Sequence, residues 1–174
     1  MNKAVLISIR PTWCAAIAAG RKTIEVRKTA PNLPTPFKCY IYCTKAKSDK
    51  DVLTPCNDLS DVRNGTVIGE FVCDNVAKYW ANSIGFSALS SDSLVPARDL
   101  HVYAQPRDYL YGWHIFDLKI YDEPKKLIDF QRACDQKEDC CTCKRWNLKD
   151  FSCIAGITKA PQSWCYVEEC DSGA

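Results

Sequence analysis

Alternating and β-branched segments predict most of the first 121 residues as a series of β-strands. Val, Ile, Tyr and Phe dominate these segments, and several have the period-two spacing of a strand with one buried face. The predicted strands are Val5–Ile9, Thr23–Lys28, Lys38–Thr44, Thr66–Cys73 and Gly112–Tyr121. Gly69 is a candidate β-bulge, because a glycine inside a strand often marks such an irregularity.

Proline and glycine mark the segments between the strands. Pro11 suits the first turn of a helix and Gly20 suits the left-handed residue after it, so a helix containing residues 13–19 is predicted between them. Three prolines make residues 30–36 a stiff loop. The mixed segment Ser83–Leu100 predicts one or two short helices that form a cap.

The later strands complete the predicted architecture. Strict alternation over Gly112–Tyr121 places Trp113 and Lys119 on one face, and predicts His114 on the other as a half-buried histidine with its polar atoms satisfied. Pro161–Glu168 is predicted as a last strand that returns to the sheet. Several strands, few short helices and no βαβ rhythm indicate an α+β fold built on a mixed, curled β-barrel.

Composition limits the classes of protein to be considered. At 174 residues the chain is expected to form a single domain. Apolar residues make up 47% and the formal net charge is only +2, so a nucleic-acid binder of this composition would use a local basic patch. The sequence lacks an apolar run of about 18 residues and a leader pattern, which predicts a cytoplasmic protein with no membrane contact.

Twelve cysteines are unevenly distributed, and seven of them lie in the last quarter of the chain. We interpret residues 125–160 as a cysteine-rich insertion before the last strand. A structural zinc ion needs four thiolate or imidazole ligands in a tetrahedral array. The candidate ligands are Cys134, Cys140 or Cys141, Cys143 and Cys153. The alternative is a set of free thiols or a local disulfide, and no cofactor is required by the rest of the sequence.

The most concentrated group of charges among strand-forming residues lies in residues 20–28, which read GRKTIEVRK. On a strand, Glu25 and Arg27 share the face opposite the two apolar residues, and Lys22 lies close to the strand entry. Lys22 and Arg27 are suited to hold a phosphate, and Glu25 to orient Arg27 or act as a general base. The alternative is an exposed edge strand with a surface ion pair worth about 0–1 kcal/mol.

This segment resembles the G-x-K-x-x-E-x-R signature of the ASCH domain family, relatives of the PUA fold. The lead-in Ile7–Trp13 and the later segments Val67–Phe71 and Tyr111–Ile115 are also similar to ASCH proteins, so the resemblance covers residues 4–121 and resumes at Pro161–Glu168. The resemblance implies a PUA-like β-barrel with a few short helices. It also implies that Lys22, Glu25 and Arg27 line a ligand cleft.

The leading functional prediction is binding of RNA or a nucleotide-like ligand in that cleft. Arg10, Lys45 and Glu70 are predicted to flank it, and Trp113 and Trp164 are the aromatic side chains best suited to stack on a base. Most aromatic residues of such a fold have the alternative role of core or rim packing.

Two other functions stay open, and the sequence does not decide whether the protein is an enzyme. One branch of the ASCH family resembles amidohydrolases that act on acetylcytidine with the motif lysine and a threonine three positions later. Here that position is Glu25, so a hydrolase acting on a modified nucleoside or on RNA would use Lys22 and Glu25 as its acid/base pair. The third possibility is a non-catalytic adaptor whose cysteine-rich segment, residues 131–155, meets an unknown protein partner.

Overall fold

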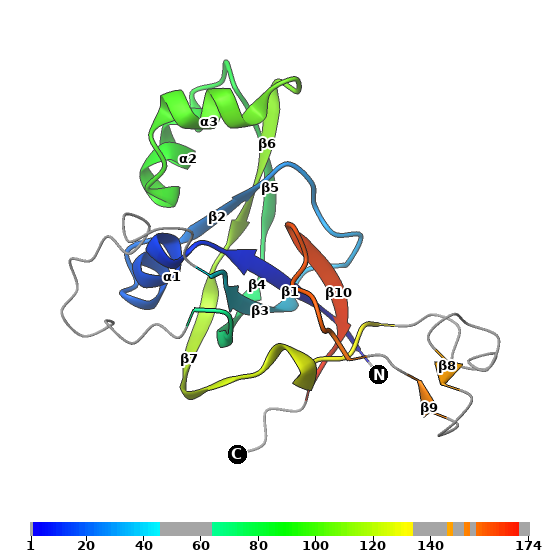
Figure 1. Cartoon of the computed structure of the whole chain (residues 1–174). Coiled ribbons are helices and arrows are strands. Elements are labelled where there is room, and N and C mark those ends of the chain that lie inside the picture. Colours follow the sequence, from blue (N-terminus) through cyan, green and yellow to red (C-terminus); the bar gives the residue numbers. More distant parts are fainter. Residues whose placement is uncertain (1, 46–63, 134–145, 148–151, 154–155, 171–174) are drawn as a thin grey trace.

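The computed structural model describes residues 2–45, 64–133, 146–147, 152–153 and 156–170 (Figure 1). Its strands form a five-stranded sheet, a three-stranded sheet and a two-stranded ribbon, accompanied by short helices. This is an α+β architecture, as the sequence predicts. Among the described strands, no strand pairing closes either sheet into a barrel. The sequence predicts a barrel, whereas the structure shows separate sheets.

The large sheet has the strand order β10-β1-β3-β4-β7. Its strands are β1 (Lys3–Ile9), β3 (Phe37–Cys43), β4 (Val67–Cys73), β7 (Phe116–Lys125) and β10 (Trp164–Glu168). β1 and β3 are parallel, and the other pairs are antiparallel. The last strand returns to β1, as predicted. The β4–β7 register shifts beside Gly69, which confirms the predicted bulge; a Cβ there would lie 2.4 Å from the Lys119 carbonyl oxygen.

The small sheet is antiparallel and has the strand order β2-β6-β5. Its strands are β2 (Ile24–Arg27), β6 (Tyr109–His114) and β5 (Val76–Trp80). Two helices, α2 (Gly85–Ser93) and α3 (Ala97–Ala104), lie beside the small sheet at the upper end of the molecule (Figure 1). Their side chains pack with the apolar residues of β2 into one cluster, so the helices cover one face of this sheet.

The remaining elements are short. Helix α1 (Pro11–Ala18) follows β1, and Gly20 after it has a φ of 68°, the left-handed conformation that the sequence predicts. A 3₁₀ turn, η2 (Leu127–Asp129), follows β7. The two-stranded ribbon consists of β8 (Trp146–Asn147) and β9 (Ser152–Cys153).

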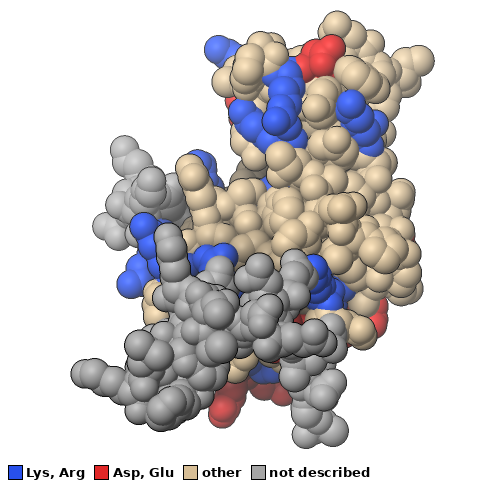
Figure 2. All heavy atoms as spheres, turned by 90° about the vertical axis from the view of Figure 1, so that its right-hand side faces the viewer, with Lys and Arg blue, Asp and Glu red and all other residues tan. Residues whose placement is uncertain are grey.

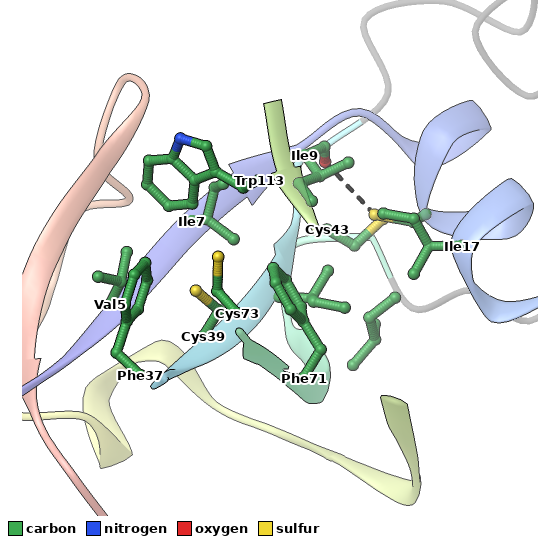
Figure 3. Packing of buried hydrophobic residues seen from close by; sticks show 13 residues of the cluster. Val5, Ile7, Ile9, Ile17, Phe37, Cys39, Cys43, Phe71, Cys73 and Trp113 are labelled. Atoms are coloured by element: carbon green, nitrogen blue, oxygen red, sulfur yellow. Dashed lines mark hydrogen bonds between the residues drawn. The ribbon is translucent and has the colours of Figure 1, made fainter. Parts of the chain in front are cut away.

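The main core lies on the face of the large sheet that meets α1 and the open face of the small sheet. It contains apolar residues of β1, β3 and β4 together with Trp113 of β6 (Figure 3). Phe37 meets the Trp113 ring edge to face, with centroids 6.0 Å apart. A second cluster, which includes Tyr40 and Phe130, packs on the opposite face of the large sheet. The two sheets therefore share the main core, and the second cluster is separate.

One predicted strand is wrong in its extent. Gly112–Tyr121 is not continuous: β6 ends at His114, β7 begins at Phe116, and the two strands belong to different sheets. Asp117 has a φ of 45°, so the backbone turns as the chain crosses from one sheet to the other. Trp113 and Lys119 therefore do not share a strand face. The side-chain alternation changes phase at the crossing, because Ile115 and Leu118 both pack against the main core.

Among the described residues, no helix is long and apolar enough to cross a membrane. Half of the predicted cysteine-rich insertion, residues 125–160, lies outside the described residues. Its division from the rest of the chain therefore stays a prediction.

Candidate functional site

The three charged residues of the motif lie together in the interior. β2 is an edge strand of the small sheet, but Lys22 and Glu25 are only 2% and 4% exposed and the Arg27 side chain is 13% exposed. The alternative of a solvated surface ion pair is therefore wrong. The main core, which includes residues of the large sheet and of α1, covers the face of β2 that carries Glu25. The side chains on that face are therefore excluded from solvent.

Glu25 is the centre of the group. Its Oε1 lies 3.0 Å from Arg27 Nη1, and its Oε2 lies 3.3 Å from Lys22 Nζ. Lys22 Nζ also donates a hydrogen bond to the Ser93 carbonyl at 2.8 Å, and Arg27 Nη2 donates to the Ser8 carbonyl at 2.6 Å. The motif cluster, Lys22, Glu25 and Arg27, thus ties β2 to β1 and to the end of α2. With all three groups ionised it has a formal charge of +1.

Three buried polar atoms at this site have no hydrogen-bond partner within the described part of the chain: Glu25 Oε2, Arg27 Nε and Trp113 Nε1. The strand register brings them together, because Glu25 lies directly opposite Trp113 and Arg27 is two residues further along the same face. Figure 3 shows the Trp113 indole nitrogen directed away from the labelled core side chains. Buried polar groups without partners are uncommon and costly, so each requires an explanation.

Burial also changes the acid–base properties of Lys22. Desolvation lowers its pKa, and the neighbouring Glu25 carboxylate opposes that shift. The Lys22 ammonium lies 5.3 Å from the centroid of the Trp13 ring, so an aromatic face and a carboxylate share this cation. A lysine held in this way is a strong hydrogen-bond donor and is easier to deprotonate than an exposed lysine.

The two predicted tryptophans lie side by side at this site. Trp113 is fully buried in the main core, and its ring centroid is 5.8 Å from that of Trp164 in β10. Trp164 is half-buried and donates from Nε1 to the Thr29 hydroxyl at 3.1 Å. The Trp113 ring is therefore occupied by core packing, and only its indole N–H has no hydrogen-bond partner among the described residues.

Glu70 lies elsewhere. It is a neighbour of Tyr40 across the β3–β4 ladder, on the face that carries the second cluster. Its Oε2 accepts a 2.5 Å hydrogen bond from the Tyr121 hydroxyl, and its Oε1 lies 3.6 Å from Lys38 Nζ. We refer to Lys38, Glu70 and Tyr121 as the Glu70 cluster. The predicted placement of Glu70 beside the motif cluster is not seen.

The remaining predicted site residues are peripheral or untested. Arg10 is exposed at the start of α1, and Lys45 is exposed with its side chain over Gly65. The structure does not bring either into contact with the motif cluster in any interaction that we identify. Among the predicted zinc ligands, Cys134, Cys140 and Cys143 lie outside the described residues, and only the backbone of Cys153, in β9, is described. The side chains that the structure describes contain no group of three metal-binding residues, and the zinc prediction stays untested.

Comparison with solved structures places this geometry in a known fold. The chain matches the crystal structure of an ASCH protein from Zymomonas mobilis with a TM-score of 0.60 and 18% identity, covering 95% of this chain and 88% of that one. Tyrosine-to-phenylalanine and serine-to-alanine mutants of that protein match with TM-scores of 0.59 and 19% identity. The first covers 97% of this chain and 92% of its own, and the second 95% and 89%.

The fold is that of ASCH proteins. This confirms the resemblance to ASCH proteins and the α+β class over nearly the whole chain. No protein-family model matches the sequence, and a search of curated proteins gives no match either. The likeness therefore establishes the ASCH fold, and the function has to be argued from the site.

The sequence did not predict one element that bears on the site. β5 supplies Lys78 and Trp80 to the open face of the small sheet, next to the aromatic residues of β6. Its residues, Val76–Trp80, include β-branched and aromatic types and follow Asp74-Asn75, a turn-forming pair. That signal was available in the sequence. In the structure it places further cations and rings on the sheet face that carries Glu25.

Proposed function

We propose that the protein binds RNA or a nucleotide-like ligand at the motif cluster. The observation that supports this most is a pair of buried donors without a hydrogen-bond partner among the described residues, Arg27 Nε and Trp113 Nε1. They lie beside Glu25, whose Oε2 is held only by an ion pair with Lys22 at 3.3 Å. A nucleobase edge carries acceptors in its plane, and a phosphate supplies acceptors, so a nucleotide would satisfy both donors.

The charge of the cluster supports the same class of ligand. Two cations and one carboxylate give a formal charge of +1 in a nearly dehydrated site, which favours an anionic or electron-rich ligand. A buried ionic group of this kind is a poor way to gain stability, because desolvation offsets much of its Coulomb attraction. The ASCH-like fold is the one for which the sequence resemblance implies a ligand cleft lined by these residues.

The test is a binding titration of the purified protein. Fluorescently labelled single-stranded RNA, double-stranded RNA, DNA and free nucleosides are titrated at two salt concentrations, and every sample is afterwards analysed by mass. We expect salt-sensitive binding that weakens at least about tenfold in Arg27→Ala and in Glu25→Gln. Glu70→Gln is the matched control, because it changes the other buried carboxylate. Equal affinity in all three variants and the wild type would contradict the proposal.

A hydrolase is the second candidate, and the state of Lys22 favours it. Burial lowers the pKa of Lys22, and its Nζ lies 3.3 Å from Glu25 Oε2, so the two groups are arranged as an acid/base pair. The hydroxyl that acts in the related amidohydrolases is replaced by the Glu25 carboxylate. A changed mass of the nucleic acid in the titration would establish turnover, and turnover that persists in Glu25→Gln would exclude this acid/base pair.

A further inference from the structure

The open face of the small sheet continues beyond the motif cluster as a surface of cations and aromatic rings. The β2–β6–β5 register arranges it in cross-strand rows. Glu25, Trp113 and Val76 form the first row, Arg27, Tyr111 and Lys78 form the second, and Tyr109 and Trp80 form the third. Because α2 and α3 cover the other face, all these side chains lie on one side of the sheet.

Exposure increases along these rows. Trp113 is fully buried in the first row, Tyr111 is half-buried in the second, and Trp80 is 48% exposed in the third. The first and third rows are four positions apart along β5, which corresponds to about 13 Å at the rise per residue of a strand. The face thus leads from the buried motif cluster to solvent over a length that accommodates a few nucleotides.

The exposed end combines rings and cations closely. Lys78 Nζ lies 3.6 Å from the Tyr109 ring centroid and 4.2 Å from that of Trp80, and the two rings meet edge to face at 5.2 Å. The Arg107 guanidinium lies 5.9 Å from the Tyr109 centroid and donates a hydrogen bond to the Lys28 carbonyl at 2.8 Å. These contacts hold the rings and cations in place before any ligand arrives.

Lys28 follows Arg27 directly, and its side chain lies on the α3 side of the small sheet. Its Nζ donates to the Gln105 carbonyl at 2.9 Å and lies 5.1 Å from the Tyr103 ring centroid, and Tyr103 is 39% exposed. Figure 2 shows Lys and Arg side chains gathered on the upper part of the molecule, at the height of α3 and the upper ends of β5 and β6, beside a smaller acidic group.

We propose that this surface, which we call the sheet track and define as Lys78, Trp80, Arg107 and Tyr109, binds the nucleotides that flank the one held at the motif cluster. The ligand is a single-stranded nucleic acid. Exposed rings stack on bases only when those bases are unpaired, and the cations neutralise the phosphates between them. A duplex keeps its base faces stacked inside and leaves the rings without a partner. The sheet track extends the proposed function but is tested separately from it.

The experiment compares a random-sequence 12-nucleotide single-stranded RNA with its duplex and with the four ribonucleoside 5′-monophosphates, using the full chain. We expect the 12-mer to bind at least about tenfold more tightly than any monophosphate and than the duplex. Trp80→Ala is expected to weaken 12-mer binding by about tenfold through lost stacking. Lys78→Ala and Arg107→Ala are expected each to reduce the salt dependence by about 0.7 in the logarithmic slope.

Matched controls lie on the other sheet. Phe116 is 55% exposed and Lys119 is exposed, both in β7, so Phe116→Ala and Lys119→Ala remove a ring and a cation at a distance from the sheet track. Circular dichroism and thermal unfolding check that each variant is folded. We expect both controls to bind the 12-mer like the wild type.

The outcomes separate the sheet track from the motif site. Trp80→Ala and Lys78→Ala variants that bind the 12-mer as tightly as the two controls would overturn the sheet track, and so would a 12-mer no tighter than a monophosphate. If Trp80→Ala weakens the 12-mer while Arg27→Ala changes nothing, the sheet track stands and the proposed function of the motif cluster fails. Loss of monophosphate binding in Arg27→Ala, but not in Trp80→Ala, would support both proposals as stated.

Discussion

Two groups among the described residues are built from a lysine and a buried glutamate, and the donors around them differ. In the Glu70 cluster, each carboxylate oxygen has a contact, with Lys38 on one side and the Tyr121 hydroxyl on the other. Lys38 Nζ also lies 3.4 Å from Glu169 Oε1. In the motif cluster, each oxygen of Glu25 also has a cation, Arg27 at 3.0 Å and Lys22 at 3.3 Å. Two buried donors beside it, Arg27 Nε and Trp113 Nε1, have no hydrogen-bond partner among the described residues.

On the proposed function, this difference separates a structural role from a ligand-binding one. A polar group whose contacts are complete rigidifies the fold, which is the role we expect of the Glu70 cluster. A buried donor without a partner costs stability until a ligand supplies an acceptor. Unpaired donors beside the carboxylate therefore distinguish two lysine–glutamate pairs that are alike in residue type.

The largest expected effect comes from removing the central carboxylate of each cluster. Glu25→Ala leaves Lys22 and Arg27 buried together without a counter-charge, so we expect a loss of about 3–5 kcal/mol in the free energy of unfolding. Glu70→Ala leaves Lys38 with Glu169 and is expected to cost about 1–3 kcal/mol. Urea unfolding of both variants measures the difference. Equal losses would show that the two clusters are energetically alike.

The second-largest effect is expected from the loss of one hydrogen bond in the Glu70 cluster. Tyr121→Phe removes the hydroxyl that donates to Glu70 and leaves the ring in place, so we expect a loss of about 1–2 kcal/mol with unchanged ligand binding. Urea unfolding and the RNA titration measure the two quantities on the same sample. Weaker binding in this variant, with its fold intact, would mean that the Glu70 cluster belongs to the functional site.

A smaller change in stability is expected from Lys22→Met. Methionine fills the space of the lysine stem and removes the cost of desolvating the ammonium, while Glu25 keeps its pair with Arg27. We expect the free energy of unfolding to change by no more than about 1 kcal/mol, and ligand binding to weaken at least about tenfold. The result that would contradict this is a variant that loses several kcal/mol yet binds normally.

The sequence predicted contacts between neighbouring residues better than contacts that depend on the pairing of distant strands. Lys22, Glu25 and Arg27 lie within six residues, so strand geometry alone predicts their proximity. Glu70 was misplaced because its face depends on the bulge at Gly69. Simple alternation would put Glu70 on the same face as Ile68, but the register slip places Ile68 and Phe71 together in the main core and turns Glu70 to the other face.

The burial of site residues also depends on pairing and packing between segments that are distant in the sequence. Trp113 was identified as a site residue, but its burial depends on the packing of the small sheet against the large one, which the chain reaches only by crossing between sheets after His114. The burial of Glu25 depends on elements that pack against β2 from distant parts of the chain, and no local pattern encodes them. Local spacing therefore predicted which side chains meet, and the tertiary structure decided which of them are dehydrated.

The smallest expected effect is a pH dependence of opposite sign in the two clusters. Burial lowers the pKa of Lys22 below its ordinary value near 10.5, so as pH approaches 10.5 the unfolded chain carries more protons there than the folded protein, and this group makes stability rise. Burial, and then the hydrogen bond to Glu70, raise the pKa of Tyr121 above its ordinary value of 10.0. The unfolded chain then loses that proton first, so stability falls as pH rises past about 10.

Urea unfolding between pH 7 and 11 separates the two contributions when each variant is subtracted from the wild type. The stability of the wild type relative to Lys22→Met is expected to increase toward pH 10.5, because methionine does not titrate and the other groups cancel. Its stability relative to Tyr121→Phe is expected to decrease above pH 10. Two differences that change in the same direction would contradict the assignment of one cluster to open, dehydrated charge and the other to a completed hydrogen bond.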